Sequence, residues 1–148
     1  MIEINNLTSA SIDKDFFKKV GQKVLEKENK KKAKLSVALI KEKEIRQLNK
    51  RYLGKDQATD VLAFPETKYL KKKFKTGDDV LGEIVICPQV VKKNARKFNS
   101  PFEKELCQVL IHGILHLLGY NHEKSVREAE KMEEKENYYL DKYFVKSK

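Results

Sequence analysis

The chain contains three histidines, and all of them lie in one segment, His-Gly-Ile-Leu-His-Leu-Leu-Gly-Tyr-Asn-His. His112 and His116 are four residues apart, so on a helix their imidazoles project from one face with Cβ atoms about 5–6 Å apart. Gly119 can take the left-handed conformation that ends a helix, and the reversal can bring His122 toward the same face. Three protein ligands with a fourth position left for water are typical of catalytic zinc. The spacing therefore predicts one Zn²⁺ per chain on His112, His116 and His122.

The alternative is that these are ordinary histidines, hydrogen-bonded in or near the core. Their helix is apolar, and the nearest acidic residue on it is Glu105. An unpaired buried polar group costs on the order of 1–3 kcal/mol, so burying two imidazoles there would be unfavourable. Metal ligation accounts for both residues at once, which favours the zinc interpretation.

The same spacing occurs in the zinc peptidase motif H-E-x-x-H-x-x-G-x-x-H, in which the glutamate is the general base. Here that position is Gly113. Glycine cannot deprotonate a zinc-bound water, so a zinc peptidase is the less favoured alternative. The metal-bound water is the one catalytic species that the motif predicts, and the identity of the general base stays open.

The composition points to a polyanionic partner. The chain has 148 residues with 36% charged and 40% hydrophobic side chains, and its net charge is +10. A basic surface attracts nucleic acid, although a lysine- and glutamate-rich solvated surface would give the same charge. The chain has no apolar run of the roughly 18 residues that cross a membrane, and no export signal at its start. We therefore expect a cytoplasmic protein without a membrane partner.

Hydrophobic periodicity divides the chain into strands and helices. Strands are predicted at 1–6, 35–40, 59–64 and 80–87, and helices at 11–27, 42–52, 89–98, 101–118 and 123–143. The helix 101–118 is apolar nearly all round, so we expect it to be buried. No linker or repeat divides the chain, which predicts a single domain over 1–148. The pattern indicates an α+β fold with a small mixed β-sheet packed against helices, and a metal site at the C-terminal end of the buried helix.

Phosphodiester cleavage also needs cations for the charge that builds on the phosphate oxygens. Lys55 and Arg51 are the candidate phosphate contacts, and a solvated structural role is the alternative for each. A lysine-dense loop lies between two predicted strands and consists of Lys68, Tyr69, Leu70, Lys71, Lys72, Lys73, Phe74 and Lys75. Lysines interleaved with aromatic rings are typical of a groove that follows a nucleic-acid backbone and stacks on its bases. The alternative is that this loop is only a solvated surface. A second basic cluster lies on the next helix, at Lys92, Lys93, Arg96 and Lys97.

Three stretches make the chain resemble the YbeY-type endoribonucleases of bacteria, a family of ribosomal RNA maturation factors. They run from Leu48-Asn49 through Thr59-Asp60-Val61-Leu62-Ala63-Phe64-Pro65, then Leu81-Gly82-Glu83-Ile84-Val85-Ile86, and finally His112 to His122. The resemblance implies a single α+β domain, a zinc ion on the three matching histidines and single-stranded RNA as substrate. It further implies 16S rRNA 3′ end processing, ribosome quality control and a partner in the ribosome or its small subunit.

The chain departs from this family at three positions. Many members have arginine, thought to engage substrate phosphate, where this chain has Leu53, so no arginine role is transferred. Aspartate is common before the last histidine, where this chain has Asn121, and serine is common at Ala63. An amide keeps an acceptor oxygen but carries no charge, so an acid or base role for Asn121 does not follow.

Our interpretation is a zinc-dependent, single-strand-specific endoribonuclease acting in ribosomal RNA maturation. The metal could activate a bound water, or it could polarise a phosphoryl oxygen while the 2′-hydroxyl of the RNA attacks. The main alternative is a noncatalytic RNA-binding ribosome assembly factor with a structural metal. DNA is not an expected partner.

Overall fold

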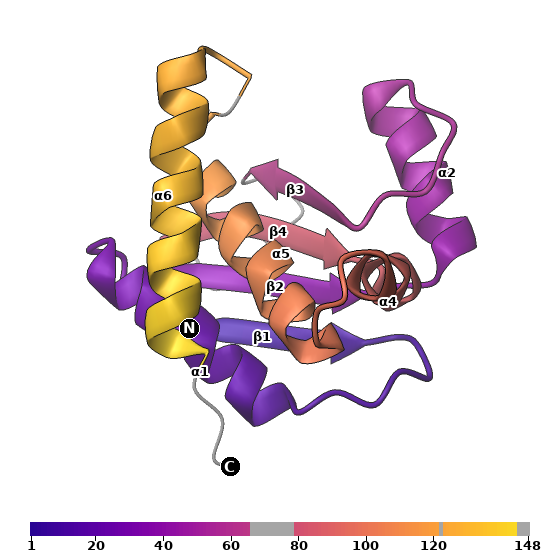
Figure 1. Ribbon diagram of the computed structural model, residues 1–148, viewed down its shortest axis with the longest axis horizontal. Coiled ribbons are helices and arrows are strands. Elements are labelled where there is room, and N and C mark those ends of the chain that lie inside the picture. The colour runs from indigo at the N-terminus through magenta and orange to yellow at the C-terminus, as the bar shows by residue number, and fades with distance from the viewer. Residues whose placement is uncertain (66–78, 122, 145–148) are drawn as a thin grey trace.

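The computed structural model of the chain describes residues 1–65, 79–121 and 123–144. Its elements follow the predicted order, with every helix and strand boundary within three residues of the expected one (Figure 1). In chain order they are β1 (Ile2–Asn6), α1 (Lys14–Lys27), β2 (Lys34–Leu39), α2 (Glu42–Leu53), β3 (Val61–Pro65), β4 (Val80–Ile86), α4 (Pro88–Lys97), α5 (Phe102–Leu117) and α6 (Val126–Tyr143).

The strands form one sheet in the order β1-β2-β4-β3. β1 and β4 run parallel to β2, whereas β3 runs antiparallel to β4 and lies at the edge. A Cβ at Gly82 would clash with the carbonyl oxygen of Phe64, so the close approach of β3 and β4 requires glycine there. The mixed sheet and its helices confirm the predicted α+β fold.

The side chains of β4 alternate between the two faces of the sheet. Ile84 and Ile86 belong to the main core, which they share with α1, α5 and α6, whereas Val85 and Cys87 belong to a smaller core beneath α2. Helix α5 lies against the sheet and is covered by α6 (Figure 1). Half of its residues are buried, as predicted. The buried helix therefore gives the histidines a rigid support.

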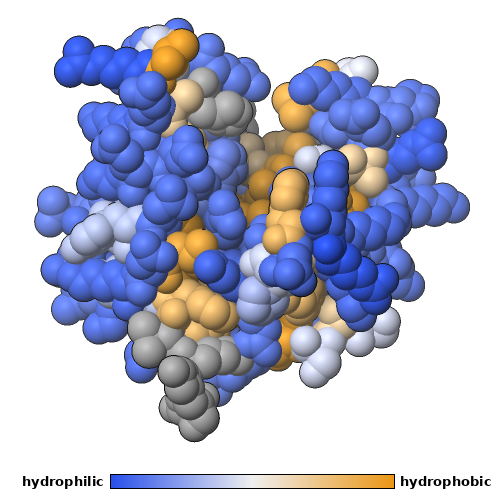
Figure 2. Space-filling view, viewed as in Figure 1, coloured by the Kyte–Doolittle hydropathy of each residue, from blue (hydrophilic) through white to orange (hydrophobic). Residues whose placement is uncertain are grey.

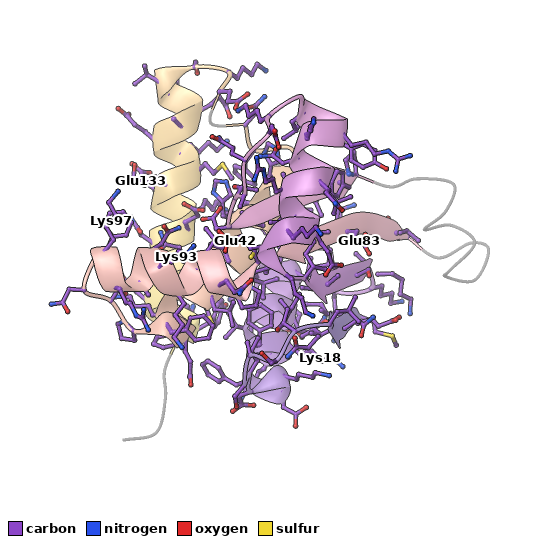
Figure 3. The ribbon with its side chains drawn as sticks, turned by 90° about the vertical axis from the view of Figure 1, so that its right-hand side faces the viewer. Lys18, Glu42, Glu83, Lys93, Lys97 and Glu133 are labelled. Atoms are coloured by element: carbon purple, nitrogen blue, oxygen red, sulfur yellow. The ribbon has the colours of Figure 1, made fainter. Side chains whose placement is uncertain are left out.

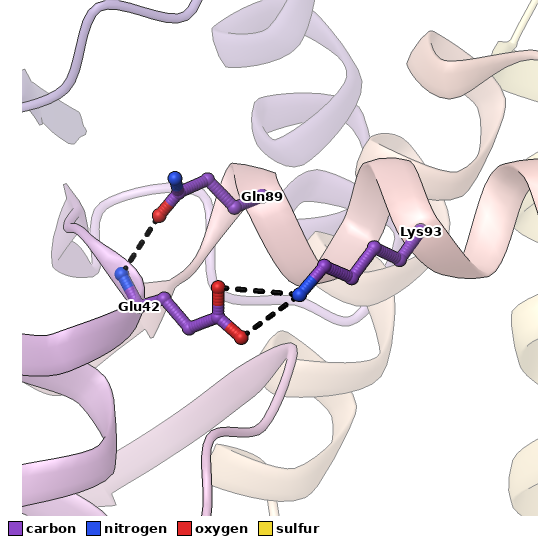
Figure 4. Close-up of polar contacts among 3 residues, drawn as sticks. All are labelled: Glu42, Gln89 and Lys93. Atoms are coloured by element: carbon purple, nitrogen blue, oxygen red, sulfur yellow. Dashed lines mark hydrogen bonds and ion pairs between the residues drawn. The ribbon is translucent and has the colours of Figure 1, made fainter.

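Helix α2 is joined to α4 through its first residue. Because Lys41 provides no side-chain cap, the backbone N–H of Glu42 donates instead to Oε1 of Gln89 on α4, at 2.9 Å (Figure 4). The carboxylate of Glu42 also accepts from Nζ of Lys93, at 3.0 Å (Figures 3 and 4). Lys93 is thus paired with a carboxylate and is not an unopposed member of the basic cluster on α4. These contacts join α2 to α4.

None of the helices within the described ranges has both the length and the apolar composition needed to cross a membrane. Helix α5, which is rich in leucine and isoleucine, is only 16 residues long and lies inside the protein. Helix α6 has 18 residues but alternates acidic and basic side chains.

Candidate active site

The end of α2, strand β3 and helix α5 enclose a cleft of about 610 Å³. Figure 2 shows this face of the molecule hollowed between the surface over α6 and the surface over α2, with hydrophobic side chains inside the hollow. His112, His116 and Lys55 all line the cleft. Arg51 is not among the described residues that line it. The cleft therefore brings together two of the predicted ligands and one of the two predicted phosphate contacts.

The two described histidines have a parallel arrangement. Their ring centroids lie 6.3 Å apart with an angle of 10° between the planes. His112 is partly buried, and His116 lies exposed in the last turn of α5. The third predicted ligand, His122, lies outside the described residues. Among the residues that are described, no group of three or more histidine, cysteine or acidic side chains could hold a metal.

A carboxylate from α6 orients the first histidine. Nδ1 of His112 lies 2.5 Å from Oε1 of Glu136, whose side chain is only 12% exposed. This hydrogen bond raises the pKa of His112 against the lowering effect of burial, and the negative charges of Glu136 and Asp60 add to the rise. Asp60, at the entrance to β3, lines the same cleft. The local field around His112 therefore favours positive charge.

A backbone carbonyl orients the second histidine. The chain reverses after α5 through Gly119, whose φ of 103° lies in the left-handed region, as predicted. The reversal brings the carbonyl of Tyr120 to 3.3 Å from Nδ1 of His116. The side chain of Tyr120 in turn donates from its hydroxyl to Oε1 of Glu28, at 2.8 Å. The turn after α5 is thus fixed to the end of α1.

Glu28 is the centre of a buried polar cluster. Its side chain is 9% exposed, and its carboxylate accepts from Lys135 at 2.9 Å and from the hydroxyl of Tyr139 as well as from Tyr120. Burial alone would raise the pKa of Glu28, but the hydrogen bonds from Tyr139, Lys135 and Tyr120 outweigh burial and lower it. The cluster joins α1, the turn after α5 and α6.

The chemistry of the two histidines fits a zinc ion. An Nδ1–H that donates to an oxygen fixes the tautomer in which Nε2 carries the lone pair, and this tautomer can bind a metal through Nε2. His112 has such an oxygen in Glu136, and His116 has one in the Tyr120 carbonyl. A carboxylate or carbonyl behind the imidazole is the usual surrounding of a zinc-bound histidine. Imidazole nitrogen is also a ligand that zinc prefers.

Gly113, which stands in the place of the peptidase glutamate, packs closely against Ile84 of β4. A Cβ at Gly113 would lie 2.9 Å from Cδ1 of Ile84 and 3.1–3.2 Å from two further carbons of that side chain. Helix α5 therefore approaches β4 so closely that a side chain at position 113 would force the Ile84 side chain to shift. This close packing favours glycine, and without a glutamate here the chain lacks the general base of the peptidase mechanism.

A short turn between α2 and β3 presents Lys55. Gly54 ends α2 with a φ of 71°, and the buried Asn49 donates from Nδ2 to the carbonyl of Gln57, at 2.9 Å. The backbone N–H of Lys55 donates to the Asn49 carbonyl at 3.3 Å. Asn49 therefore holds the turn, while the Lys55 side chain stays exposed in the cleft. Arg51 lies instead with its guanidinium 5.6 Å from the ring centroid of Tyr52.

The three departures from the resembled family can be placed in the structure. Leu53 is the last residue of α2 and is 59% exposed at the rim of the cleft. Asn121 accepts on Oδ1 from the backbone N–H of Glu123, at 2.9 Å, and so shapes the turn before α6. Ala63 lies in β3 opposite Ile84.

Comparison with known proteins decides the family. A family model described as "Endoribonuclease YbeY" matches residues 3–144. The chain belongs to the YbeY family. It is 47% identical over 107 residues to an "Endoribonuclease YbeY" of Thermotoga sp. (strain RQ2), a match that covers 72% of this chain and 65% of that relative. The first relatives found, from Thermotoga, are thus matched over less than two thirds of their length.

Other YbeY relatives are matched more completely. The "Endoribonuclease YbeY" of Persephonella marina is 40% identical over 127 residues, which cover 85% of this chain and 80% of the relative. The solution structure of TM1509 from Thermotoga maritima superposes with a TM-score of 0.66 at 38% sequence identity, covering 97% of this chain and 89% of that one. The resemblance predicted from the three sequence stretches is confirmed.

Reasoning from the sequence missed the residues behind the histidines. Glu136 lies 24 residues after His112, and Glu28 lies 92 residues before Tyr120. In the sequence, each is one of many charged residues in a solvated helix or turn, so nothing marked it as a partner of the site. The prediction that the lysine-dense loop 68–75 offers stacking surfaces concerns residues outside the described ranges. It stays a prediction.

Proposed function

We propose that this YbeY-family chain is a zinc-dependent endoribonuclease that cleaves single-stranded RNA. The observation that carries the proposal is the pair His112 and His116 in one cleft, each with Nδ1 engaged by an oxygen. The printed name of the relatives, endoribonuclease, supports RNA as the substrate. The net charge of +10 supports a polyanion.

His112, His116 and His122 would hold the zinc. When bound, zinc supplies Lewis-acid stabilisation of the charge that develops on the phosphate oxygens. Glu136 and the Tyr120 carbonyl would hold the two described imidazoles in the tautomer whose Nε2 can bind zinc.

Lys55 places an ammonium group in the same cleft, where it can bind a phosphate of the strand and hold it near the histidines. Arg51 lies outside the described lining of the cleft, so we propose that it contacts a flanking phosphate rather than the one that reacts.

The biological role we propose is ribosomal RNA maturation, including 16S rRNA 3′ end processing, and ribosome quality control. It rests on the family resemblance set out above, which also implies the ribosome or its small subunit as partner. The positive charge of the chain is compatible with a ribosomal RNA surface.

The alternative is a noncatalytic RNA-binding assembly factor with a structural metal. One variant distinguishes it from the proposed endoribonuclease. His116→Ala removes a proposed ligand that is exposed at the end of α5, so it should disturb the core less than a change at the partly buried His112. We expect cleavage of a labelled single-stranded RNA to fall at least 100-fold, because a ligand to the catalytic metal is lost, while RNA binding and the thermal transition change little.

The matched control is Lys104→Ala, also on α5 but outside the cleft, purified in parallel and expected to cleave like the wild type. Cleavage that persists in His116→Ala would identify a contaminating nuclease and support the assembly factor. A duplex RNA of the same sequence should be cleaved poorly, and casein should not be cleaved.

A further inference from the structure

The rim of the cleft carries two exposed hydrophobic side chains that packing does not explain. Tyr52 is 57% exposed and Leu53 is 59% exposed. They are consecutive residues at the end of α2, and both line the cleft that contains His112 and His116. Of the seven large hydrophobic side chains exposed in the described residues, these are the two in this cleft. Such a patch in a concave site marks a place where a ligand binds.

The ring of Tyr52 is held in a defined orientation. It makes an edge-to-face contact with Phe64 of β3, with centroids 5.3 Å apart and an angle of 67° between the planes. Phe64 is partly buried against the smaller core under α2, so it gives the tyrosine a fixed support. Most of the Tyr52 side chain nevertheless stays accessible. A fixed, accessible ring can stack on a flat partner at little entropic cost.

One cation lies over this ring and another lines the cleft. The guanidinium of Arg51 lies 5.6 Å from the centroid of the Tyr52 ring, and Lys55 lines the cleft that Tyr52 also lines. An aromatic ring flanked by cations in a groove is how proteins bind single-stranded nucleic acid: the ring stacks on a base and the cations neutralise phosphates. An apolar protein partner would fit this charged, concave surrounding poorly.

We infer that Tyr52 is a base-stacking subsite, with Phe64 as its support and with Arg51 and Lys55 as contacts to neighbouring phosphates. The subsite holds one base of a single-stranded RNA so that the neighbouring phosphodiester lies near His112 and His116. This inference rests on the proposed function and adds a binding determinant to it. Such a subsite would favour single strands, because a base inside a duplex already stacks on its neighbours and cannot reach the ring.

The test uses binding rather than cleavage. Fluorescence anisotropy of a labelled single-stranded oligoribonucleotide is compared with that of an oligonucleotide of equal length whose central residues are abasic, so that both carry the same phosphates. The variants are Tyr52→Ala and Tyr52→Phe. The matched control is Tyr138→Ala on α6, because Tyr138 is 53% exposed with Lys142 5.4 Å from its ring centroid but lies outside the cleft.

We expect Tyr52→Ala to weaken binding of the normal oligonucleotide on the order of tenfold and to leave binding of the abasic one unchanged. Tyr52→Phe and Tyr138→Ala should bind like the wild type. In multiple-turnover cleavage, Tyr52→Ala should raise KM more than it lowers kcat. An equal loss with both oligonucleotides, or no loss with either, would overturn the stacking role.

A spectroscopic readout is available because the chain has no tryptophan. Tyr52→Trp introduces a single indole at the subsite, and stacking on a base should quench its emission when the normal oligonucleotide is added. The abasic oligonucleotide should quench it little, and Tyr138→Trp should respond to neither. Quenching that is equal at the two positions would contradict the inference.

The failure of this inference can be told apart from the failure of the proposed function. If the wild type binds and cleaves RNA while the Tyr52 variants are unaffected, only the subsite is overturned. If the wild type does not bind RNA, the proposed function is overturned as well.

Discussion

His112 on α5 and Glu136 on α6 are joined by a contact of 2.5 Å between Nδ1 and Oε1, across 24 residues of sequence. Helix α6 therefore does more than cover the core, because it supplies the carboxylate that sets the tautomer of a proposed zinc ligand. The side chains of Glu136 and His112 are 12% and 33% exposed, so solvent screens this interaction only in part.

Replacing Glu136 should weaken zinc binding without removing a ligand. We expect Glu136→Ala to lower the zinc affinity about 10- to 100-fold, because the imidazole of His112 loses the acceptor that orients it. Glu136→Gln should show a smaller loss, since its amide oxygen can still accept from Nδ1. Competition with a chromophoric chelator measures the affinity, and Glu133→Gln, an exposed residue of the same helix (Figure 3), is the control. Equal zinc affinities in Glu136→Ala and the wild type would show that the contact does not serve a metal site.

The Glu28 cluster makes stability depend on pH. The folded pKa of Glu28 is lowered, so its stabilising effect is fully present above its ordinary pKa of 4.5 and is lost as the pH falls through the lower folded value. At neutral pH, Glu28→Gln should reduce the free energy of unfolding by about 1–3 kcal/mol, since three donors lose a charged acceptor. Below pH ~4 the difference from wild type should shrink. Urea unfolding across this range measures it, with Glu26→Gln as the exposed control; a difference that is constant with pH would contradict the assignment.

The close packing of Gly113 predicts a net cost for a single methyl group. Gly113→Ala gains about 0.5–1 kcal/mol of helix stability but forces a contact with Ile84, and such overpacking costs about 1–3 kcal/mol. The overpacking term is larger, so the variant should unfold more easily by about 1 kcal/mol. Ile84→Val removes the atom that lies nearest, so the double variant should be less destabilised than the sum of the single ones. If the destabilisation of the double variant equals the sum of the single ones, the strain does not come from contact with Ile84.

Lys55 should contribute to RNA affinity through charge alone. Lys55→Ala should weaken binding of single-stranded RNA irrespective of sequence and reduce the slope of log K against log salt by ~0.7, the value for one phosphate contact. Lys43→Ala, an exposed lysine near the start of α2 and outside the cleft, is the matched control and should leave the slope unchanged. An unchanged slope in Lys55→Ala would assign this lysine a solvated role.

Local patterns in the sequence predicted the helices and strands well, because apolar spacing reports which face of each element is buried. The starts of α1 and α6 were placed too early: the side chains of Asp13 and Ser125 accept from backbone N–H groups and begin these helices at Lys14 and Val126. Contacts between distant segments could not be predicted. Helix α6 contains many glutamates, and only its packing against α5 selects Glu136 as the partner of His112.

The same limit applies to the cleft. The predicted phosphate contacts Lys55 and Arg51 lie only four residues apart, but Gly54 ends the helix between them, so Lys55 lines the cleft and Arg51 lies over the Tyr52 ring. The Tyr52–Phe64 pair joins α2 to β3, and no spacing rule connects these residues. This part of the cleft rim forms only when α2 packs beside β3, so the sequence could not predict it.

The central claim is that zinc on the histidines is required for RNA cleavage, and one titration tests it most directly. The wild-type protein is stripped of metal, checked for an intact fold, and assayed on a labelled single-stranded RNA while zinc is added in small increments. The account predicts that cleavage is lost on stripping and returns in proportion to zinc, reaching its plateau at about one ion per chain. Cleavage that is unchanged in the stripped protein, or that fails to return when one equivalent of zinc has bound, would contradict it.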